Sequence, residues 1–273
     1  MIEFNDLPTW FKNQSDDFLD TNKIHFIDNF NQEPSIHIVF KSSDRLNNFE
    51  EKLIKTSPVS GFLINKKDLK KIKSFKEGDW WVQDFSSFFP IHNLPYENEN
   101  KKFLDACAAP GGKTFQILSK KLNIISNDRS DSRLKILKSN LKRLNLHTEV
   151  LKKDFLLFKE NKKYDFIILD APCSSVGTIR RNPEIFFKTK SPNFKELNEL
   201  QKKMLDKASL LLNKKGFILY MVCSFLKSET INQINKFLLR RDDFEIYKFT
   251  ILERNKQYSK FVNKQFFITL PDT

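Results

Sequence analysis

The chain has 273 residues, of which 40% are hydrophobic and 28 are Phe, and its 47 Lys and Arg outnumber 34 Asp and Glu to give a formal net charge of +13. This apolar content excludes an intrinsically disordered chain and is enough for a sizeable core. No run approaches the roughly 18 consecutive apolar residues that a membrane span needs, and the first residues do not have the pattern of a signal peptide. We therefore expect a cytoplasmic protein without a membrane partner.

The cysteines and the charge narrow the class of partner. Cys107, Cys173 and Cys223 form no CxxC pair, and the four histidines lie far apart in the sequence. This odd set predicts neither a disulfide framework nor a bound metal.

The positive charge attracts polyanions over a long range and favours a nucleic acid as partner, although a mostly Lys-based charge is also typical of a solvated basic surface.

The N-terminal part predicts a small α+β domain, residues 1–76. A helix is expected to begin near Leu7, strands are expected over 35–40 and 61–64, and a second helix over 45–54. A Lys-rich stretch and the turn signal at Gly78 then mark the junction to a second domain, residues 77–273.

The second domain alternates short apolar runs with amphipathic segments. Strands are expected over 103–105, 123–126, 148–151, 164–169, 216–222, 244–249 and 265–270, and helices over 113–121, 130–144, 194–212 and 228–240. Strands separated by helices indicate a mostly parallel sheet, and the last two strands predict a hairpin at or near its edge. The expected fold class is therefore α/β and Rossmann-like, with a small N-terminal α+β domain.

The loops after the parallel strands are expected to bind a cofactor, because ligands of open α/β sheets lie beyond the carboxyl ends of the strands. The first loop, 105–114, has two glycines and several small residues that let its backbone approach a ligand, but it has neither the phosphate-loop nor the dinucleotide glycine spacing. A nucleoside cofactor without phosphates, such as S-adenosylmethionine, suits such a loop.

Acidic residues end four successive predicted strands: Asp105, Asp128, Asp154 and Asp170. Asp128 follows Asp105 by 23 residues, close to the spacing at which a carboxylate hydrogen-bonds ribose hydroxyls. Asp154 is placed to accept a hydrogen bond from an adenine amine. A lone Asp is more often a helix cap or a turn residue, but four in series favour a nucleoside site.

Two cysteines follow neighbouring predicted strands. Cys173 comes after the fourth strand and Cys223 after the fifth, so both thiols are expected to face one pocket. The helix start predicted at Ser228 would stabilise a Cys223 thiolate. Cys107 lies inside the cofactor loop and is more simply interpreted as a small core residue.

Three segments resemble the signature motifs of the RNA cytosine-5 methyltransferases of the NOP2/Sun family, namely 105–114, 170–174 and 222–224. Within that family the chain is most similar to the bacterial 16S ribosomal RNA methyltransferase B type, whose NusB-like domain this chain is too short to hold. The resemblance implies an S-adenosylmethionine-dependent methyltransferase domain that methylates C5 of a cytosine through a covalent bond between a cysteine and C6. Ribosomal RNA is the first-choice substrate and tRNA the second, and we expect a monomer.

The resemblance also implies residue roles. Cys223 is the nucleophile and Cys173 the thiol that assists product release, while Val222 stands where the family usually has Thr. Asp170 is expected to hydrogen-bond the cytosine, and Lys113 either to neutralise charge on the base or to cap the loop. The expected cofactor-binding residues are Cys107, Ala108, Ala109, Pro110, Gly111, Gly112, Lys113, Asp128, Asp154 and Asp170. After Cys173, Arg180 and Arg181 are candidate phosphate contacts.

Two other classes of protein are weighed against this hypothesis. A non-catalytic RNA-binding or ribosome-assembly protein could keep the fold, but the retained Cys223, Cys173 and Asp170 argue against it. An amino-directed nucleic-acid methyltransferase would carry an N/D-P-P-Y/F motif after the fourth strand, where this chain has Asp-Ala-Pro-Cys at 170–173.

Overall fold

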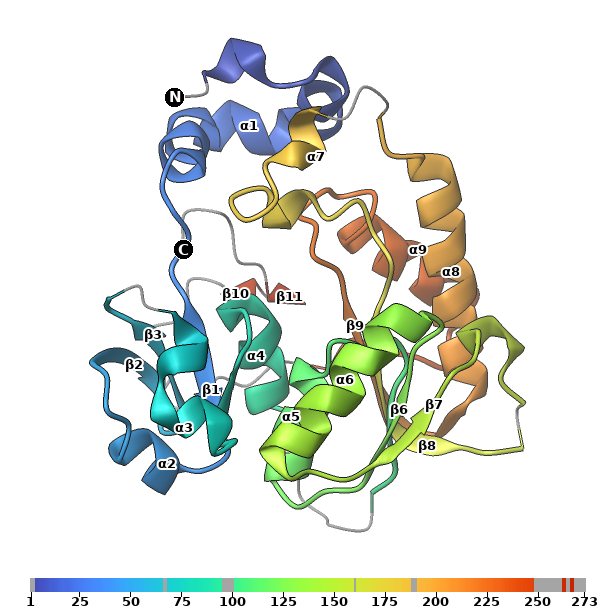
Figure 1. Ribbon diagram of the computed structural model, residues 1–273. Coiled ribbons are helices and arrows are strands. Elements are labelled where there is room, and N and C mark those ends of the chain that lie inside the picture. The colour runs from blue at the N-terminus through green and yellow to red at the C-terminus, as the bar shows by residue number, and fades with distance from the viewer. Residues whose placement is uncertain are drawn as a thin grey trace.

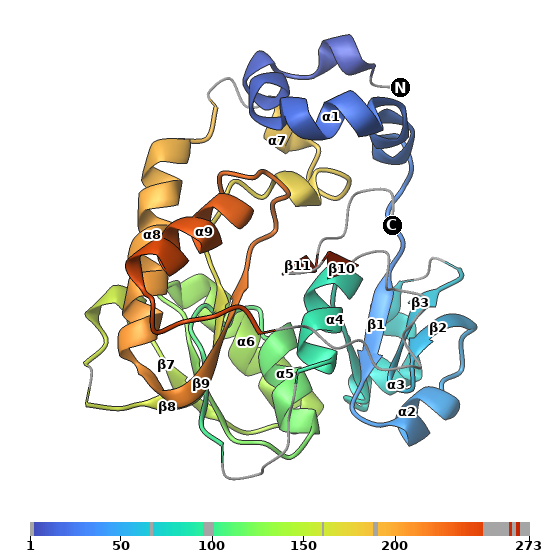
Figure 2. The ribbon, with the colours of Figure 1, turned by 180° about the vertical axis from the view of Figure 1, so that it is seen from behind.

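A computed structural model describes residues 3–65, 68–94, 101–159, 161–187, 191–247, 262–263 and 266–267 (Figures 1 and 2). Its centre is a five-stranded parallel sheet in the order β7-β6-β5-β8-β9. The strands are β5 (Phe103–Asp105), β6 (Ile124–Asn127), β7 (Glu149–Leu151), β8 (Tyr164–Asp170) and β9 (Leu212–Met221). The strand order reverses between β5 and β8, and this is where an open α/β sheet binds its ligands. The predicted α/β, Rossmann-like fold is confirmed.

Helices cover both faces of this sheet. They are α5 (Gly112–Ser119), α6 (Asp131–Leu144), α8 (Phe194–Leu210) and α9 (Ile231–Arg240). Successive residues of a strand point to opposite faces. Ile167 of β8 therefore joins a core cluster with Leu205 of α8, whereas the next residue, Ile168, joins one with Ile117 of α5. The predicted leucine stripe of α6 is buried at all four positions, Leu134, Leu137, Leu141 and Leu144.

A four-stranded antiparallel sheet in the order β2-β3-β1-β4 lies beside the parallel sheet (Figure 1). Its strands are β1 (His37–Phe40), β2 (Leu53–Ser57), β3 (Ser60–Leu63) and β4 (Trp80–Val82), and it is accompanied by α2 (Ser43–Asn47), η2 (Leu69–Lys71) and α3 (Lys73–Lys76). The helix predicted over 45–54 is wrong beyond Asn47, because residues 53–57 pair with β3 instead. The strand β4 lies beyond residue 76, so the antiparallel sheet extends past the predicted boundary of the first domain.

The N-terminal helix α1 (Thr9–Phe30), preceded by η1 (Phe4–Asp6), lies apart from the small sheet and next to α7 (Glu184–Phe187), as both ribbon views show. Phe11 and Phe26 of α1 form one buried cluster with Ile179 and Phe186. The predicted unit 1–76 therefore spans two packing environments. One is the antiparallel sheet, and the other is a helical layer over the segment that follows β8.

The remaining described elements are α4 (Phe85–His92), η3 (Phe155–Leu157), η4 (Val176–Thr178), β10 (Val262–Asn263) and β11 (Phe266–Phe267). β10 and β11 pair with each other in a separate two-stranded sheet, and the Phe267 ring stacks on Phe89 at a centroid distance of 4.7 Å. Of the strand predicted over 244–249, residues 244–247 are not in a strand. Residues 248–249 and most of the strand predicted over 265–270 lie outside the described residues. In the described part of the chain, no helix has the length and apolarity that crossing a membrane requires.

Candidate active site

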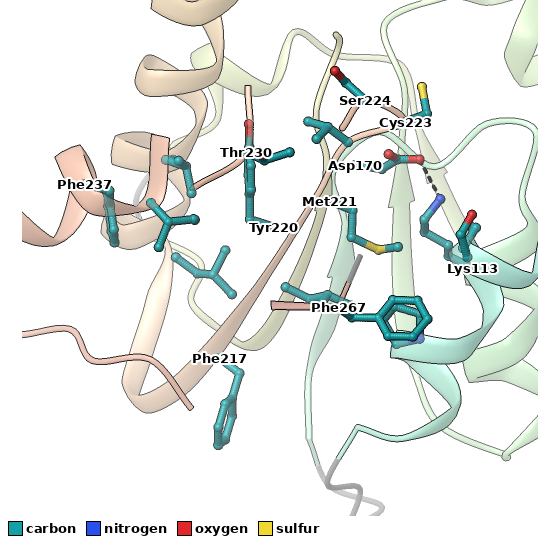
Figure 3. A pocket seen from close by; sticks show the side chains of 18 of the residues that line it. Lys113, Asp170, Phe217, Tyr220, Met221, Cys223, Ser224, Thr230, Phe237 and Phe267 are labelled. Atoms are coloured by element: carbon teal, nitrogen blue, oxygen red, sulfur yellow. Dashed lines mark hydrogen bonds and ion pairs between the residues drawn. The ribbon is translucent and has the colours of Figure 1, made fainter. Parts of the chain in front are cut away.

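A pocket of about 1930 Å³ opens at the carboxyl ends of the central strands and continues along β9 (Figure 3). Lys113, Asp170 and Cys223 lie close together at one end of it, away from Phe217 and Phe237. The small N-terminal sheet contributes Val82 of β4 to the lining, and the following residues Gln83 and Asp84 also line the pocket. The pocket therefore lies between the two sheets, at the place where the strand order reverses.

The loop between β5 and α5 has a backbone conformation that its glycines make possible. Gly111 has φ +117°, and a Cβ there would overlap the Phe115 ring, so only glycine fits without strain. Asp128 accepts a hydrogen bond from the Ala109 amide at 3.2 Å, and Arg133 donates one to the Ala109 carbonyl oxygen. Both backbone groups of Ala109 are thus fixed, which holds the loop against the pocket.

Asp105 lies beneath this loop and is fully buried. Thr114 donates a hydrogen bond to its Oδ2 at 2.9 Å, whereas Oδ1 has no partner among the described residues. Burial raises the pKa of this carboxyl to about 6, because a charged group is costly to remove from water.

An ion pair between Lys113 and Asp170 joins the loop to the end of β8. Lys113 Nζ lies 2.5 Å from Asp170 Oδ2, with side-chain exposures of 13% and 32%. Burial alone would lower the pKa of the Lys113 ammonium, but the Asp170 and Asp105 carboxylates raise it above the ordinary value. Lys113 therefore stays charged and holds Asp170 in one orientation at the pocket wall.

The thiols of Cys173 and Cys223 are in contact, with Sγ atoms 3.2 Å apart, and Cys223 Sγ lies 3.2 Å from Ser175 Oγ. The hydrogen bond with Cys173, helped by the one with Ser175, lowers the pKa of Cys223 to about 7 against the cost of burial. The same contact raises the pKa of Cys173 well above its usual value, and burial adds to this shift. The pair thus contains one thiol poised to ionise near neutral pH and one that keeps its proton.

Comparison with known proteins shows which family this chain belongs to. A family model described as 16S rRNA methyltransferase RsmB/F matches residues 93–272. The chain belongs to this family. The resemblance carried by the three sequence motifs is therefore confirmed.

Relatives of the RsmB/F family match the chain over its methyltransferase region. Ribosomal RNA small subunit methyltransferase B of Photorhabdus laumondii is 38% identical over 180 residues, which are 64% of this chain and 42% of the relative. The protein of the same name from Shewanella oneidensis is 37% identical over 185 residues, 66% of this chain and 43% of the relative. The match thus spans less than half the length of these two relatives.

Solved structures agree on the fold. The crystal structure of PH0851 superposes with a TM-score of 0.77 at 26% identity, covering 86% of this chain and 57% of that one. NSun6 from Pyrococcus horikoshii gives a TM-score of 0.74 at 16% identity and covers 88% of both chains. At that identity the second likeness concerns the fold alone.

The structure brings most of the residues predicted for the site in this RsmB/F family member to the pocket wall. Those that line the pocket are Ala108, Ala109, Pro110, Gly112, Lys113, Asp170 and Cys223. Cys173, whose sulfur contacts that of Cys223, lines a second, smaller pocket of about 360 Å³. Cys107, Gly111, Asp128 and Asp154 are not among the lining residues.

Three of these other residues have clear local surroundings. Cys107 packs against the core, and burial raises its pKa to about 12, so it is a thiol at neutral pH. Asp128 accepts hydrogen bonds from Ala109 and Ser130, and Asp154 caps η3 through the Leu156 amide. Their part in binding a cofactor stays a prediction.

Arg181 and Arg180 are placed differently from each other. Arg181 lines the pocket and forms an ion pair with Asp84 at 2.6 Å, which joins the segment after η4 to the N-cap residue of α4. Arg180 is half-buried and does not line this pocket. Of the two arginines, the structure places only Arg181 where it could meet a ligand in the pocket.

Sequence reasoning missed three residues that hold the cysteines. Ser175 contacts Cys223, while the fully buried Gln201 and Glu229 hold the backbone on either side of Cys173. The helix expected from Ser228 begins only at Ile231, and the groups that lower the pKa of Cys223 are Cys173, Ser175 and Lys113. Glu229 follows Cys223 by six positions, but no local sequence pattern marks it as buried.

Proposed function

We propose that this protein methylates C5 of a cytosine in RNA, with ribosomal RNA as the substrate, and that S-adenosylmethionine is the methyl donor. The observation that carries the proposal is the pair of thiols at the ends of β8 and β9, one of which has a depressed pKa and lines a pocket beside a cofactor-type loop. Membership of a family described as 16S rRNA methyltransferases supports the choice of RNA. The +13 charge supports a polyanionic substrate.

The residues of the pocket fit this donor. Its wall at Ala108, Ala109 and Gly112 has no long side chains, and the loop lacks the glycine spacing of a phosphate site, which suits a nucleoside donor without phosphates. These residues, with Asp170 at the neighbouring strand end, would hold it. Asp128, directly after β6, and Asp154, in the segment between β7 and η3, stay in the proposed cofactor set. When bound, S-adenosylmethionine supplies an electrophilic methyl group.

The two cysteines and Asp170 account for the chemistry on the base. C5 of cytosine is a poor nucleophile, but addition of the Cys223 thiolate to C6 forms an S–C6 bond and moves the C5–C6 electron pair so that C5 becomes enamine-like. The Asp170 carboxylate, which is paired with Lys113, is placed to accept a hydrogen bond from the exocyclic amine, and the Lys113 ammonium offsets the negative charge that develops on the ring as the thiolate adds. After methylation the C5 proton passes to water, the C5–C6 double bond re-forms, and the S–C6 electron pair returns to Cys223.

Cys173 acts when Cys223 leaves the base. Its thiol is within hydrogen-bond distance of Cys223 Sγ and keeps its proton, so it stabilises the departing thiolate. Removing Cys173 should therefore slow the last step more than the first. The expected consequence is an accumulating covalent adduct between protein and RNA.

The test compares three variants in reactions with labelled S-adenosylmethionine and a small-subunit ribosomal RNA transcript. Cys223→Ala should give no methylated product, and Cys173→Ala should accumulate an adduct that survives denaturing electrophoresis. Glu199→Gln serves as the control, because Glu199 is an exposed residue of α8 that does not line the pocket, and should transfer methyl groups at the wild-type rate. Full activity of Cys223→Ala would refute the mechanism.

The choice of RNA is tested in the same assay. A bulk tRNA sample in a parallel reaction distinguishes the second-choice substrate, and bisulfite sequencing of the product locates the cytosine. A non-catalytic ribosome-assembly protein would bind the transcript without incorporating label. Methylation of an adenine or cytosine amino group instead of C5 would also contradict the proposal.

A further inference from the structure

Two buried polar side chains hold the backbone on both sides of Cys173. On one side, Gln201 Nε2 donates a hydrogen bond to the Pro172 carbonyl oxygen at 3.0 Å. On the other side, the Ser174 amide donates to Glu229 Oε1 at 2.8 Å, and the Ser174 hydroxyl donates to Glu229 Oε2. We call Gln201 and Glu229 the Cys173 clamp.

The two members of the Cys173 clamp also contact each other. Gln201 Nε2 lies 3.1 Å from Glu229 Oε1, and Tyr220 donates its phenolic hydrogen to the Glu229 carbonyl oxygen at 2.8 Å. Gln201 comes from α8 and Glu229 from the segment before α9. Residues from β9, α8 and this segment are thus tied to the two residues that flank the thiol.

A buried carboxylate at this place is costly for stability alone. Glu229 has no exposed surface, and its carboxylate oxygens accept hydrogen bonds from three neutral donors, the Ser174 amide, the Ser174 hydroxyl and Gln201 Nε2. Burying a charge is unfavourable, and here the hydrogen bonds from Ser174 and Gln201 offset that cost. These hydrogen bonds can form only while the backbone on both sides of Cys173 stays in place, which ties the clamp to the position of the reactive thiol.

The charge of Glu229 also acts on the thiol. After the contact with Cys223 and burial, the nearby Glu229 carboxylate is among the groups that raise the pKa of Cys173. A protonated Cys173 is the form that can donate a hydrogen bond to Cys223. The Cys173 clamp thus fixes the position of the Cys173 thiol and favours its protonated form.

We infer that Glu229, together with Gln201, is a positioning residue that holds the Cys173 thiol against Cys223 and thereby sets the rate at which the methylated base is released. This inference rests on the proposed function for its kinetic part. Its geometric part concerns the free protein alone. The two parts are tested by separate measurements.

The first measurement is the alkylation rate of each cysteine in the free protein with iodoacetamide, followed by peptide mass spectrometry. Glu229→Ala should make Cys173 react several-fold faster, because the thiol is released and loses a neighbouring negative charge. Glu229→Gln, which keeps the shape, should give a smaller increase. Glu199→Gln is the matched control, since Glu199 is an exposed residue of α8, and should leave the rate unchanged. An unchanged Cys173 rate in both Glu229 variants would overturn the inference.

The second measurement is the rate at which the covalent RNA adduct resolves, in a cycle of Cys173→Ala, Glu229→Ala and the double variant. A misplacement of about 1 Å can cost about 10²-fold in rate, so Glu229→Ala should slow resolution by about that factor. In the double variant, Glu229→Ala should slow adduct resolution no further than Cys173→Ala alone, because the effects of residues that act through one another are not additive. Additive losses would assign Glu229 a merely structural role.

The two results separate the possible failures. If the wild-type protein transfers no methyl group to RNA, the proposed function fails, while the alkylation rates still decide whether Glu229 holds Cys173. If methyl transfer occurs but Glu229→Ala leaves adduct resolution unchanged, the inference fails and the proposed function stands. Partial recovery of the resolution rate in Glu229→Gln would distinguish positioning from a loss of folding.

Discussion

Cys173 and Cys223 lie 50 residues apart in the chain, yet their sulfur atoms are 3.2 Å apart. The contact arises because β8 and β9 are parallel neighbours, with Asp170 opposite Met221. The loops that follow the two strands therefore leave the sheet at the same level. Two thiols this close cannot titrate independently. The contact lowers the pKa of Cys223 and raises that of Cys173, so Cys223 loses its proton first and Cys173 keeps its own.

The first prediction concerns the pH dependence of Cys223. Only the thiolate is nucleophilic, so its alkylation rate should rise as the pH rises through about 7 and then level off. In Cys173→Ala the stabilising hydrogen bond is absent, and the midpoint should move up towards the ordinary value of 9.0. Rates measured across this pH range by mass spectrometry check both values. A midpoint that does not move in the variant would contradict the role of the contact.

The second prediction concerns the ion pair of Lys113 and Asp170. Asp170→Asn removes the carboxylate and leaves a mostly buried ammonium without its partner, so the free energy of unfolding should fall by about 1–3 kcal/mol, less than for a fully buried pair. Lys113→Met should cost less, because it removes the buried charge and leaves Asp170 in contact with water. Urea unfolding measures both. Equal losses in the two variants would argue against this asymmetry.

The sequence predicted the parts of the fold that local patterns determine. The leucine spacing of α6 and the five parallel strands follow from periodicity, and the thiol contact follows from two cysteines at neighbouring strand ends. β2 could not be predicted in this way, because pairing with β3 decides its conformation. Glu229 was equally hidden, since an acidic residue after Ser228 is typical of an exposed helix start, and only the tertiary fold buries it.

The third prediction concerns the contact between α1 and the segment that follows β8. Phe11 is fully buried, and its ring lies 4.7 Å from that of Phe186 and 5.5 Å from that of Phe26. Phe11→Ala should lower the free energy of unfolding by about 3–5 kcal/mol, because it leaves a large cavity. Phe187→Ala, at a position 70% exposed, is the control and should change it little. Thermal unfolding compares the stability of the two variants with that of the wild type. Similar losses of stability in Phe11→Ala and Phe187→Ala would contradict the packing of α1.

The fourth prediction is that His37 makes the protein less stable in mild acid. His37 is buried between the Gln83 carbonyl oxygen at 2.8 Å and the Thr56 hydroxyl at 2.9 Å, and burial lowers its pKa to about 4 from 6.5. Between these two pH values the unfolded chain binds a proton that the folded protein does not, so stability falls as the pH falls. The full difference corresponds to about 3 kcal/mol.

Urea unfolding of the wild type, His37→Gln and His147→Gln at several pH values isolates this effect. His37→Gln removes the titrating group, so its stability should depend less steeply on pH between 6.5 and about 4. His147 is exposed, and His147→Gln should follow the wild type. Other groups that titrate in this range are common to all three proteins, which makes the difference between the curves the relevant quantity. Parallel curves for the wild type and His37→Gln would show that the imidazole is protonated in the folded state as readily as in the unfolded chain.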